Sequence, residues 1–256
     1  MPVRLKDKIA LVVGGTRGIG RGIVEAFADE GADVVFLGRN EAAGRSLEAA
    51  IASSGGRAEY LSCDVLELDQ LEDAISDVVR RKGGLDILVN NAGYALGLSL
   101  EESTLAAYDQ LFDLNVRAAF FAMKWGAGAM FASDRGGSII NITSTAATRG
   151  FPNRALYCGT KGALMQMSRA AALDVASHRV RINCLSPGMV DTELLREIHF
   201  GGQDNQDALV DEIGRLAPLG RVGRPSEIAA AAVYLASDDA AWVTGAEIRV
   251  DGGHAI

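Results

Sequence analysis

Short apolar runs, rich in β-branched residues, alternate along the chain with longer stretches of helical periodicity. Strands of a parallel sheet are buried on both faces, so they are apolar throughout. The pattern therefore predicts an α/β fold, in which a doubly wound parallel sheet of about seven strands carries helices on both faces. The predicted strands are residues 9–13, 34–37, 58–62, 87–89, 138–142, 181–185 and 247–250. The predicted helices are residues 18–30, 41–54, 67–82, 104–131, 155–177 and 226–236.

No linker rich in proline or serine divides the chain, so residues 1–256 are predicted to form a single domain. The only long segment without clear periodicity is 191–224, which is rich in Gly, Asp and Gln. In a compact domain, such a segment is more often a mobile insertion over a site than a random coil. We therefore expect residues 191–224 to form a lid over the substrate.

Composition narrows the class of protein further. The chain has 256 residues, a formal net charge of −8, 48% hydrophobic residues and 30 glycines. These values exclude disorder and a disulfide-rich miniprotein, and they disfavour nucleic acid as a partner, because binding phosphates requires a basic face. No run of about 20 apolar residues predicts a membrane span, and the charged N-terminus lacks the features of a signal peptide.

The cysteines and histidines give no sign of a metal or disulfide site. Cys63, Cys158 and Cys184 are odd in number, widely spaced and in apolar surroundings. We expect them to be buried free thiols, which fits a cytoplasmic protein. The three histidines are scattered without the spacing of metal ligands, so no metal is predicted.

A glycine-rich loop follows the first predicted strand and opens the first predicted helix. Gly14, Gly18 and Gly20 have the spacing Gly-x-x-x-Gly-x-Gly. Gly14 permits a tight turn, while Gly18 and Gly20 let backbone amides and the helix N-terminus approach a pyrophosphate. The alternative is a glycine turn that binds no ligand.

The end of the second predicted strand bears on the choice of dinucleotide. NAD-binding domains usually place an acid there to bind the ribose 2′-hydroxyl, but this chain has Gly38 followed by Arg39. Arg39, with Arg17 from the glycine-rich loop, could bind a 2′-phosphate. The sequence therefore favours NADP(H) over NAD(H), which stays possible. Alternatively, Arg39 stacks on an adenine or faces solvent.

Tyr157 and Lys161 are four residues apart on a predicted helix and so lie on one face. Lys161 is the only charge between Arg154 and Arg169, which indicates a partly buried cation in preference to a surface lysine. A tyrosine has an ordinary pKa near ~10, so a neighbouring ammonium would make it a useful acid or base near neutral pH.

Two more polar residues are candidates for the same site. Asn115 lies on an apolar stripe with Leu105, Tyr108 and Phe112, where a polar group must find partners or be costly. Ser144 follows the strand predicted at 138–142, at the end where parallel sheets bind ligands. A purely structural role for Asn115, and a loop-capping role for Ser144, are the alternatives.

Taken together, these residues resemble the short-chain dehydrogenase/reductase family, in its single-domain branch with a Rossmann fold. Val13 departs from the family pattern, which usually has a threonine that braces the loop. The matching motifs are Gly14-x-x-x-Gly18-Ile19-Gly20, Asn90-Asn91-Ala92-Gly93, Asn115, Ser144, Tyr157-x-x-x-Lys161, Pro187-Gly188 with Thr192, and Val250-Asp251-Gly252-Gly253.

The resemblance implies an oxidoreductase with four catalytic residues. Tyr157 would be the general acid in reduction and the base in oxidation. Lys161 would lower the pKa of Tyr157 and bind the nicotinamide ribose. Ser144 would hydrogen-bond the carbonyl oxygen, and Asn115 would hold a water that links Lys161 to solvent.

The resemblance also implies a set of cofactor contacts. Asp64 and Val65 would contact the adenine, and Val190 and Thr192 would meet the carboxamide and a phosphate. The remaining contacts would come from the glycine-rich loop, the second strand end and the Asn-Asn-Ala-Gly turn, namely Gly14, Thr16, Arg17, Gly18, Ile19, Gly20, Arg39, Asn91, Ala92 and Gly93, together with Tyr157 and Lys161.

The candidate substrate wall suggests a neutral, fairly apolar ketone or secondary alcohol. Arg149 and Arg154 are the nearest other cations, and we do not predict that they bind an anionic substrate. A 3-oxoacyl group on a carrier protein, or a non-catalytic nucleotide sensor, are alternative functions. The wall comprises Tyr94, Leu96, Thr145, Ala146, Phe151 and residues 194–200, in which only Arg196 and Glu197 are charged.

The sequence also suggests self-association. The helix predicted at 104–131 has a broad face of apolar and small residues, one side of which is too apolar for water. Proteins of the family it resembles are commonly dimers or tetramers, so we expect a homodimer or homotetramer. The residues of this face are Ala118, Ala119, Phe120, Ala122, Met123, Ala127 and Met130.

Overall fold

The strands form one parallel sheet in a computed structural model that describes residues 3–133, 135–201 and 206–256. Within these residues the sheet has seven strands in the order β3-β2-β1-β4-β5-β6-β7. This confirms the predicted doubly wound α/β fold. The strands are β1 (Ile9–Val13), β2 (Asp33–Gly38), β3 (Arg57–Ser62), β4 (Ile87–Asn90), β5 (Gly137–Ile142), β6 (Val180–Pro187) and β7 (Glu247–Val250).

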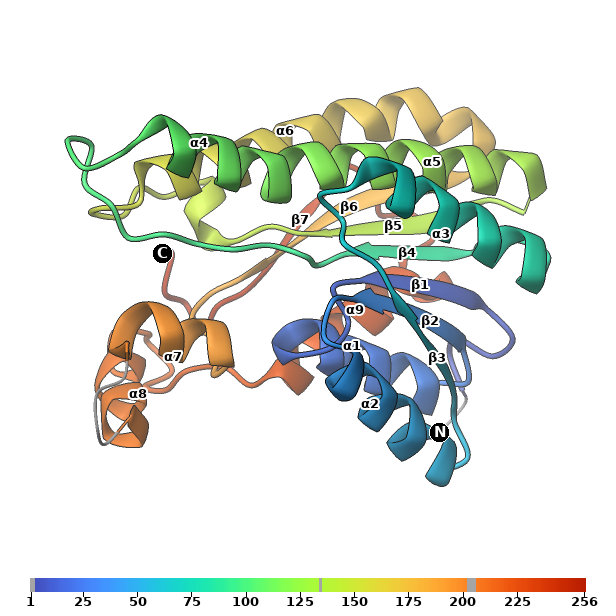
Figure 1. Cartoon of the computed structure of the whole chain (residues 1–256), viewed down its shortest axis with the longest axis horizontal. Helices are drawn as coiled ribbons and strands as arrows, with labels where there is room; N and C mark the ends of the chain where they lie inside the picture. Colours follow the sequence, from blue (N-terminus) through green and yellow to red (C-terminus); the bar gives the residue numbers. More distant parts are fainter. Residues whose placement is uncertain (1–2, 134, 202–205) are drawn as a thin grey trace.

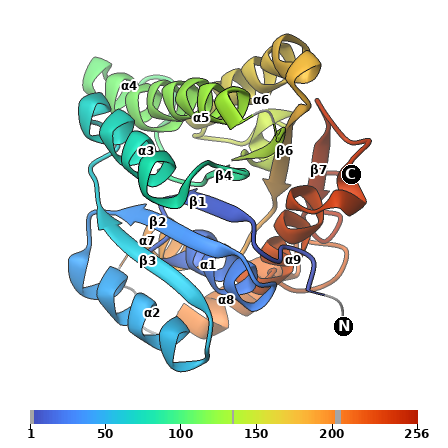
Figure 2. The ribbon, with the colours of Figure 1, turned by 90° about the vertical axis from the view of Figure 1, so that its right-hand side faces the viewer.

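Helices cover both faces of the sheet (Figures 1 and 2). One face carries α1 (Gly18–Asp29), α2 (Glu41–Ser53) and α9 (Pro225–Ala236). The other carries α3 (Leu68–Lys82), α5 (Ala119–Ser133) and α6 (Ala155–Val175). Because both faces are covered, the central strands are buried along their whole length, which explains their continuous apolar character.

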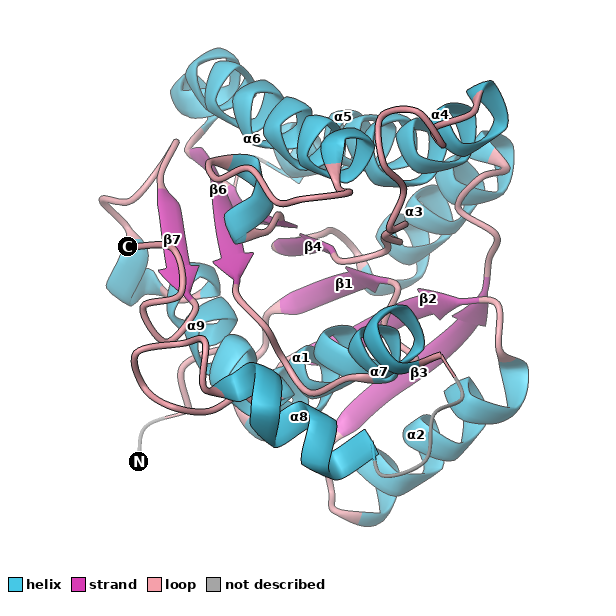
Figure 3. Ribbon diagram, turned by 90° about the vertical axis from the view of Figure 1, so that its left-hand side faces the viewer, coloured by secondary structure: helices cyan, strands magenta, loops and turns pink. Residues whose placement is uncertain are grey.

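The order of the strands decides where a ligand can bind. The chain runs outward from β1 through β2 to β3, then returns to the other side of β1 with β4. The connections on the two sides of this switch point diverge, which opens a crevice at the carboxyl ends of β1 and β4. Figure 3 views this end of the sheet, with α7 (Glu193–Phe200) and α8 (Gln206–Gly214) in front of it.

The segment 191–224 was predicted without regular structure, and this was wrong in part because α7 and α8 both lie within it. Thr192 caps α7 by accepting a hydrogen bond from the backbone N–H of Leu195 at 3.2 Å. The two ends of the segment meet, because the N–H of Asp191 donates to the carbonyl of Gly223 and that of Gly223 to Met189. The chain therefore leaves the sheet after Met189 and returns to the same place at Gly223. This connectivity is the one that a lid would require. The side chains of His199 and Phe200, which belong to the predicted substrate wall, and residues 202–205 lie outside the described part of the chain.

The helix predicted at 104–131 is divided into three parts. These are α4 (Leu105–Phe112), a π-helical segment at Asp113–Ala118, and α5. Its expected stripe is wrong at the start, because Leu105 and Tyr108 are exposed. Its expected interface is also mostly buried against the sheet, since Phe120 is the only exposed residue of that set.

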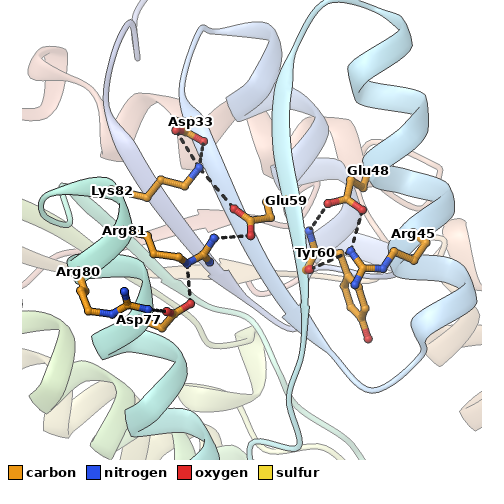
Figure 4. Close-up of polar contacts among 9 residues, drawn as sticks. All are labelled: Asp33, Arg45, Glu48, Glu59, Tyr60, Asp77, Arg80, Arg81 and Lys82. Carbon is orange, nitrogen blue, oxygen red and sulfur yellow. Dashed lines mark hydrogen bonds and ion pairs between the residues drawn. The ribbon is translucent and has the colours of Figure 1, made fainter.

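A group of ion pairs joins α3 to the edge of the sheet, at the end away from the crevice (Figure 4). Lys82 bonds Asp33 at 3.0 Å and lies 3.4 Å from Glu59. Arg81 bonds the same Glu59 at 2.6 Å and Asp77 at 2.6 Å. Such a network is partly shielded from water and fixes α3 against β2 and β3.

The cysteines are free, and the prediction that they are buried holds for Cys63 and Cys184. Cys158 is only half-buried, because it lies in the first turns of α6 near the crevice. In the described part of the chain, none of the helices is both long enough and apolar enough to span a membrane.

Candidate active site

A cavity of about 720 Å³ runs along the carboxyl ends of the strands. It brings together residues from the glycine-rich loop, the ends of β2 to β6, the start of α6 and the segment after β6. Of the predicted site residues, Gly20 and Asn115 do not line it. Those that do are Gly14, Thr16, Arg17, Gly18, Ile19, Arg39, Asp64, Val65, Asn91, Ala92, Gly93, Ser144, Tyr157, Lys161, Val190 and Thr192.

The glycine-rich loop is held close to the turn after β4. Gly14 has a φ of +83°, and a Cβ placed on it would lie 2.8 Å from the backbone of Ala92. The Asn91 side chain donates a hydrogen bond to the carbonyl of Gly14 at 2.7 Å. Asn91 therefore braces the loop, a function that the apolar side chain of Val13 cannot provide. The resemblance implied that Asn91 contacts the cofactor, and this brace was not predicted.

Gly20 is a packing residue in this loop. A Cβ on Gly20 would lie 2.0 Å from the carbonyl oxygen of Gly14, so any side chain would separate α1 from the loop. Gly18 instead lines the cavity with a φ of +53°, and its hypothetical Cβ would contact Thr192 at 3.2 Å. The loop thus presents backbone and the N-terminus of α1 to the cavity.

Two cations stand at this end of the cavity, each beside an acid. Arg39 is exposed and lies 3.7 Å from Asp64. Arg17 bonds Glu197 of α7 at 2.9 Å. Gly38 also lines the cavity, and a Cβ on it would lie 2.6 Å from the Thr16 methyl group. The end of β2 therefore carries a cation, Arg39. An acidic side chain in place of Gly38 would be crowded by Thr16.

Tyr157 and Lys161 lie on the same face of α6 and reach the other end of the cavity. The Lys161 side chain is 5% exposed, and Nζ donates to the carbonyl of Ile142 at 3.0 Å, at the end of β5. Nζ lies 5.9 Å from the centre of the Tyr157 ring. The expectation that Lys161 is a buried cation is therefore confirmed. Ser144 follows β5, and its Oγ accepts from the N–H of Ala146 at 3.1 Å.

Burial sets the protonation of this pair. It lowers the pKa of Lys161 to about 8. Burial also raises the pKa of Tyr157, while a hydrogen bond with Ser144 and the charge of Arg154 lower it. The pKa of Tyr157 is therefore raised, whereas the resemblance implied a lowered pKa. The loss of hydration on burial outweighs these two contacts.

Asn115 is buried in the π-helical segment, where its amide is held by backbone groups. Its Oδ1 accepts from the N–H of Tyr94 at 2.8 Å, and its Nδ2 donates to the carbonyl of Tyr94 and to Thr160. A Cβ on Gly93 would lie 3.2 Å from Asn115 Oδ1 and 3.4 Å from Lys161 Nζ. The two polar groups therefore face the same small space, which a glycine keeps open.

The predicted substrate wall is largely present. Tyr94, Thr145, Ala146 and Phe151 line the cavity, as do Leu194, Leu195 and Ile198 of α7. Leu96 is not part of the lining. Arg196 pairs with Asp191 and Asp207, and Glu197 pairs with Arg17, so both charges are engaged within the protein.

Arg154 and His254 are among the polar residues of the lining that the sequence prediction missed. Arg154 precedes α6 and was set aside, while His254 lies in the C-terminal turn and had no motif to mark it. A signal existed for Arg154, because it is three residues before Tyr157 and therefore near it on the helix. None existed for His254, whose place depends on the fold alone.

The residues present fit a dinucleotide. Glycines where a Cβ would meet backbone at 2.8 Å form a cradle at the helix N-terminus, cations stand at the end of β2, and a buried lysine and tyrosine close the other end. In the described residues, no group of three or more His, Cys, Asp or Glu is placed to hold a metal.

Comparison with known proteins identifies the family. A family model described as enoyl-(acyl carrier protein) reductase matches residues 13–255. The chain is 40% identical over 252 residues to L-fucose dehydrogenase of Mus musculus, covering 98% of this chain and 89% of that protein. It is 38% identical over 250 residues to 2,5-dichloro-2,5-cyclohexadiene-1,4-diol dehydrogenase of Sphingobium indicum, covering 97% of each.

A solved structure agrees with these relatives. The crystal structure of a short-chain type dehydrogenase/reductase from Mycobacterium marinum superposes with a TM-score of 0.90 at 31% identity, covering 99% of this chain and 97% of that one. The fold and site define an α/β oxidoreductase with a dinucleotide crevice. The chain belongs to the short-chain dehydrogenase/reductase family, whose members act on CH–OH groups, and membership implies a nicotinamide cofactor.

Proposed function

We propose that the protein transfers a hydride between a nicotinamide cofactor and a neutral ketone or secondary alcohol, with Tyr157 as general acid and base. The observation that carries this proposal is the single cavity that joins the glycine-rich loop to Tyr157, Ser144 and Lys161. A binding protein without turnover would need the loop, but it would not need a tyrosine and a buried lysine beside it.

Each of the polar residues has a part in the proposed chemistry. In oxidation Tyr157 takes the proton of the substrate hydroxyl, and in reduction it returns that proton to the carbonyl oxygen. Ser144 donates a hydrogen bond to the same oxygen, where negative charge develops. Lys161 favours the anionic form of Tyr157 and binds the nicotinamide ribose. Asn115 holds a water in the space beside Gly93, from which protons reach solvent.

We infer that NADP(H) is preferred, with NAD(H) as the weaker cofactor. Arg39 supports this preference, because it follows the strand end at which an acid would select NAD. Gly38 supports it as well, since a side chain there would collide with Thr16. Arg17 supplies a second positive charge once it leaves Glu197. The bound cofactor accepts or donates the hydride.

The names of the relatives support an alcohol as substrate in the oxidative direction, since they describe dehydrogenases of L-fucose and of a cyclohexadienediol. The alternative is a 3-oxoacyl group on a carrier protein, which the description of the family model keeps open. We also infer a homodimer or homotetramer. The free thiols support a reducing, cytoplasmic location.

Replacing the proposed acid tests the mechanism directly. Tyr157→Phe removes only the hydroxyl, so turnover is expected to fall by at least 1,000-fold, on the order of the loss of an essential proton-transfer group, with cofactor affinity nearly unchanged. Turnover is followed at the reduced-nicotinamide absorbance with alcohols, ketones and 3-oxoacyl thioesters, and affinity by calorimetry. Activity within tenfold of the wild type would show that Tyr157 is not the acid. Tight cofactor binding with no turnover in the wild type would favour a nucleotide sensor.

A further inference from the structure

Two polar side-chain atoms in the cavity wall are shielded from solvent and lack a hydrogen-bond partner among the described residues. They are Nη1 of Arg154 and Nδ1 of His254. Both residues line the same cavity as Tyr157, and neither has a part in the proposed hydride transfer. Leaving a buried polar atom without a hydrogen-bond partner is costly, so its presence in a binding cavity points to a partner on the ligand.

Arg154 is held at the entrance to α6. It is the residue before the helix and lies three positions before Tyr157, which places both near one turn. Backbone contacts fix this region, because the N–H of Leu98 donates to the carbonyl of Asn153. Nη1 lies over Gly97, where an added Cβ would be only 2.6 Å away. A glycine therefore makes room for the guanidinium, whose charge already acts on Tyr157.

His254 is held by a turn that the rest of the site does not use. The Asp251 carboxylate accepts from the N–H groups of Gly253 at 2.9 Å and Ala255 at 3.0 Å, and this closes the C-terminal turn. Gly252 and Gly253 both have positive φ, which the turn requires. The ring of His254 then stacks on Phe151 at 5.6 Å between centres, with 9° between the planes. The turn thus carries the imidazole into the cavity wall.

Arg149 contacts both His254 and Phe151. Its guanidinium bonds the backbone carbonyl of His254 and lies 5.3 Å from the centre of the Phe151 ring. Burial and the Arg149 charge lower the pKa of His254, so the ring is neutral near pH 7. A neutral imidazole offers one donor and one acceptor, whereas Arg154 offers donors only.

We propose that Arg154 and His254 bind hydroxyl groups of the substrate other than the one that reacts, and that the substrate is therefore a polyhydroxylated alcohol such as a sugar or cyclic polyol. The inference rests on the proposed function of the site. A hydroxyl both donates and accepts, so it can pair with the arginine and with either tautomer of the histidine. A carboxylate can only accept, so it suits Arg154 but pairs with His254 Nδ1 only in the tautomer that is protonated there.

The apolar part of the wall fits this assignment. Leu194, Leu195 and Ile198 cover the cavity from α7 and exclude water, which strengthens each hydrogen bond inside. Sites built to bind a substrate hydroxyl reject the analogue that lacks it by large factors, because their own polar groups are left unpaired. Arg154 and His254 are then specificity residues, and they should alter the choice among alcohols more than the rate of hydride transfer.

The test compares cyclohexanol, the vicinal cyclohexanediol and inositol, with 2-hydroxycyclohexanecarboxylate as the anionic probe. In the wild type, kcat/KM should be at least ~100-fold higher for the best polyol than for cyclohexanol. Arg154→Met keeps the aliphatic stem and His254→Phe keeps the stack on Phe151. Each variant should reduce that ratio about tenfold or more, mainly by raising KM for the polyol.

Matched controls lie outside the cavity lining. Arg169→Met changes another arginine of α6, and His178→Phe changes another histidine that stacks on a phenylalanine, Phe131. Both should keep the wild-type ratio. Unchanged ratios in the Arg154 and His254 variants, or a preference for the anionic probe that Arg154→Met abolishes, would overturn the inference. If the protein oxidises alcohols without a preference for polyols, the assignment of Arg154 and His254 is wrong, but the proposed function is still supported. Absence of any turnover on any alcohol or ketone would instead refute the proposed function.

Discussion

Lys161 shows how one residue can weaken the fold and serve the site. The residue is only 5% exposed, and its pKa is lowered to about 8 from 10.5. At 1.36 kcal/mol for each pKa unit, this lowering corresponds to roughly 3 kcal/mol of lost stability at neutral pH. The bond to Ile142 recovers part of that loss. The sequence predicted the burial from the isolation of this charge, but its cost depends on the surrounding packing.

Replacing Lys161 should therefore stabilise the protein. Lys161→Met is expected to raise the free energy of unfolding at pH 7 by up to ~2 kcal/mol, measured by denaturant titration with Lys124→Met, an exposed lysine, as the control. Between pH 8 and 10.5 the unfolded chain binds the Lys161 proton and the folded chain does not. Wild-type stability therefore rises relative to the variant across that window, and the difference should shrink. A variant that is less stable at pH 7, or a difference independent of pH, would contradict the assignment.

Arg39 is the residue that we expect to decide the preference between NADP and NAD. Arg39→Ala should lower the NADP/NAD ratio of kcat/KM by about 10- to 100-fold, because a hydrogen bond to a charged phosphate contributes about 1.5–3 kcal/mol. Arg45→Ala is the control, since Arg45 bonds Glu48 and does not line the cavity. An unchanged ratio would exclude Arg39 from binding the 2′-phosphate. Gly38→Asp is less suitable by itself, because its Cβ would collide with Thr16.

At the scale of elements, α7 shows what the sequence pattern failed to reveal. Its eight residues are too few for a clear helical period, and Leu194, Leu195 and Ile198 face a cavity instead of the core. One ion pair, Arg17 to Glu197, links it to the glycine-rich loop. Because an exposed ion pair contributes at most about 1 kcal/mol, this link between α7 and the glycine-rich loop is weak.

Hydrogen exchange should reveal this weak hold. Without ligands, the amides of α7 and α8 are expected to exchange faster than those of the other helices, and to gain protection when cofactor and substrate are both bound. Glu197→Gln should speed exchange in α7 only in the free protein. The control is α3, which three ion pairs to Asp33 and Glu59 fix to the sheet. Equal protection of α7 and α8 in the free and bound protein would mean that they are not a lid.

At the scale of the whole molecule, the exposed apolar residues bear on the predicted homodimer or homotetramer. Trp242, just before the edge strand β7, is 100% exposed, and Leu173 on α6 is 81% exposed. An edge strand beside a large exposed apolar side chain is where we expect the predicted self-association to occur. The expected interface along α5 is weaker than the sequence suggested, because all its predicted residues except Phe120 are covered by the sheet and its neighbours.

Light scattering should find a dimer or tetramer of the 256-residue chain. Trp242→Glu is expected to lower the particle mass to that of a smaller assembly, because burying a charge in an interface is costly. Leu105→Glu, at an exposed residue of α4, tests whether the face along α4 also takes part. A monomeric wild type would refute the predicted self-association, and an unchanged mass for Trp242→Glu would place the interface elsewhere.

The sequence by itself determined the order of the elements, the parallel sheet and the residues that meet at its carboxyl ends. These features depend on local signals: apolar runs, glycine spacing, and a tyrosine and a lysine one helical turn apart. Tertiary structure decided the direction of the Tyr157 pKa shift, the bracing of the loop by Asn91, and the arrival of His254 in the cavity. Each of these depends on burial or on contacts between distant segments, such as Asp251 closing the last turn, and those form only when the whole sheet is assembled.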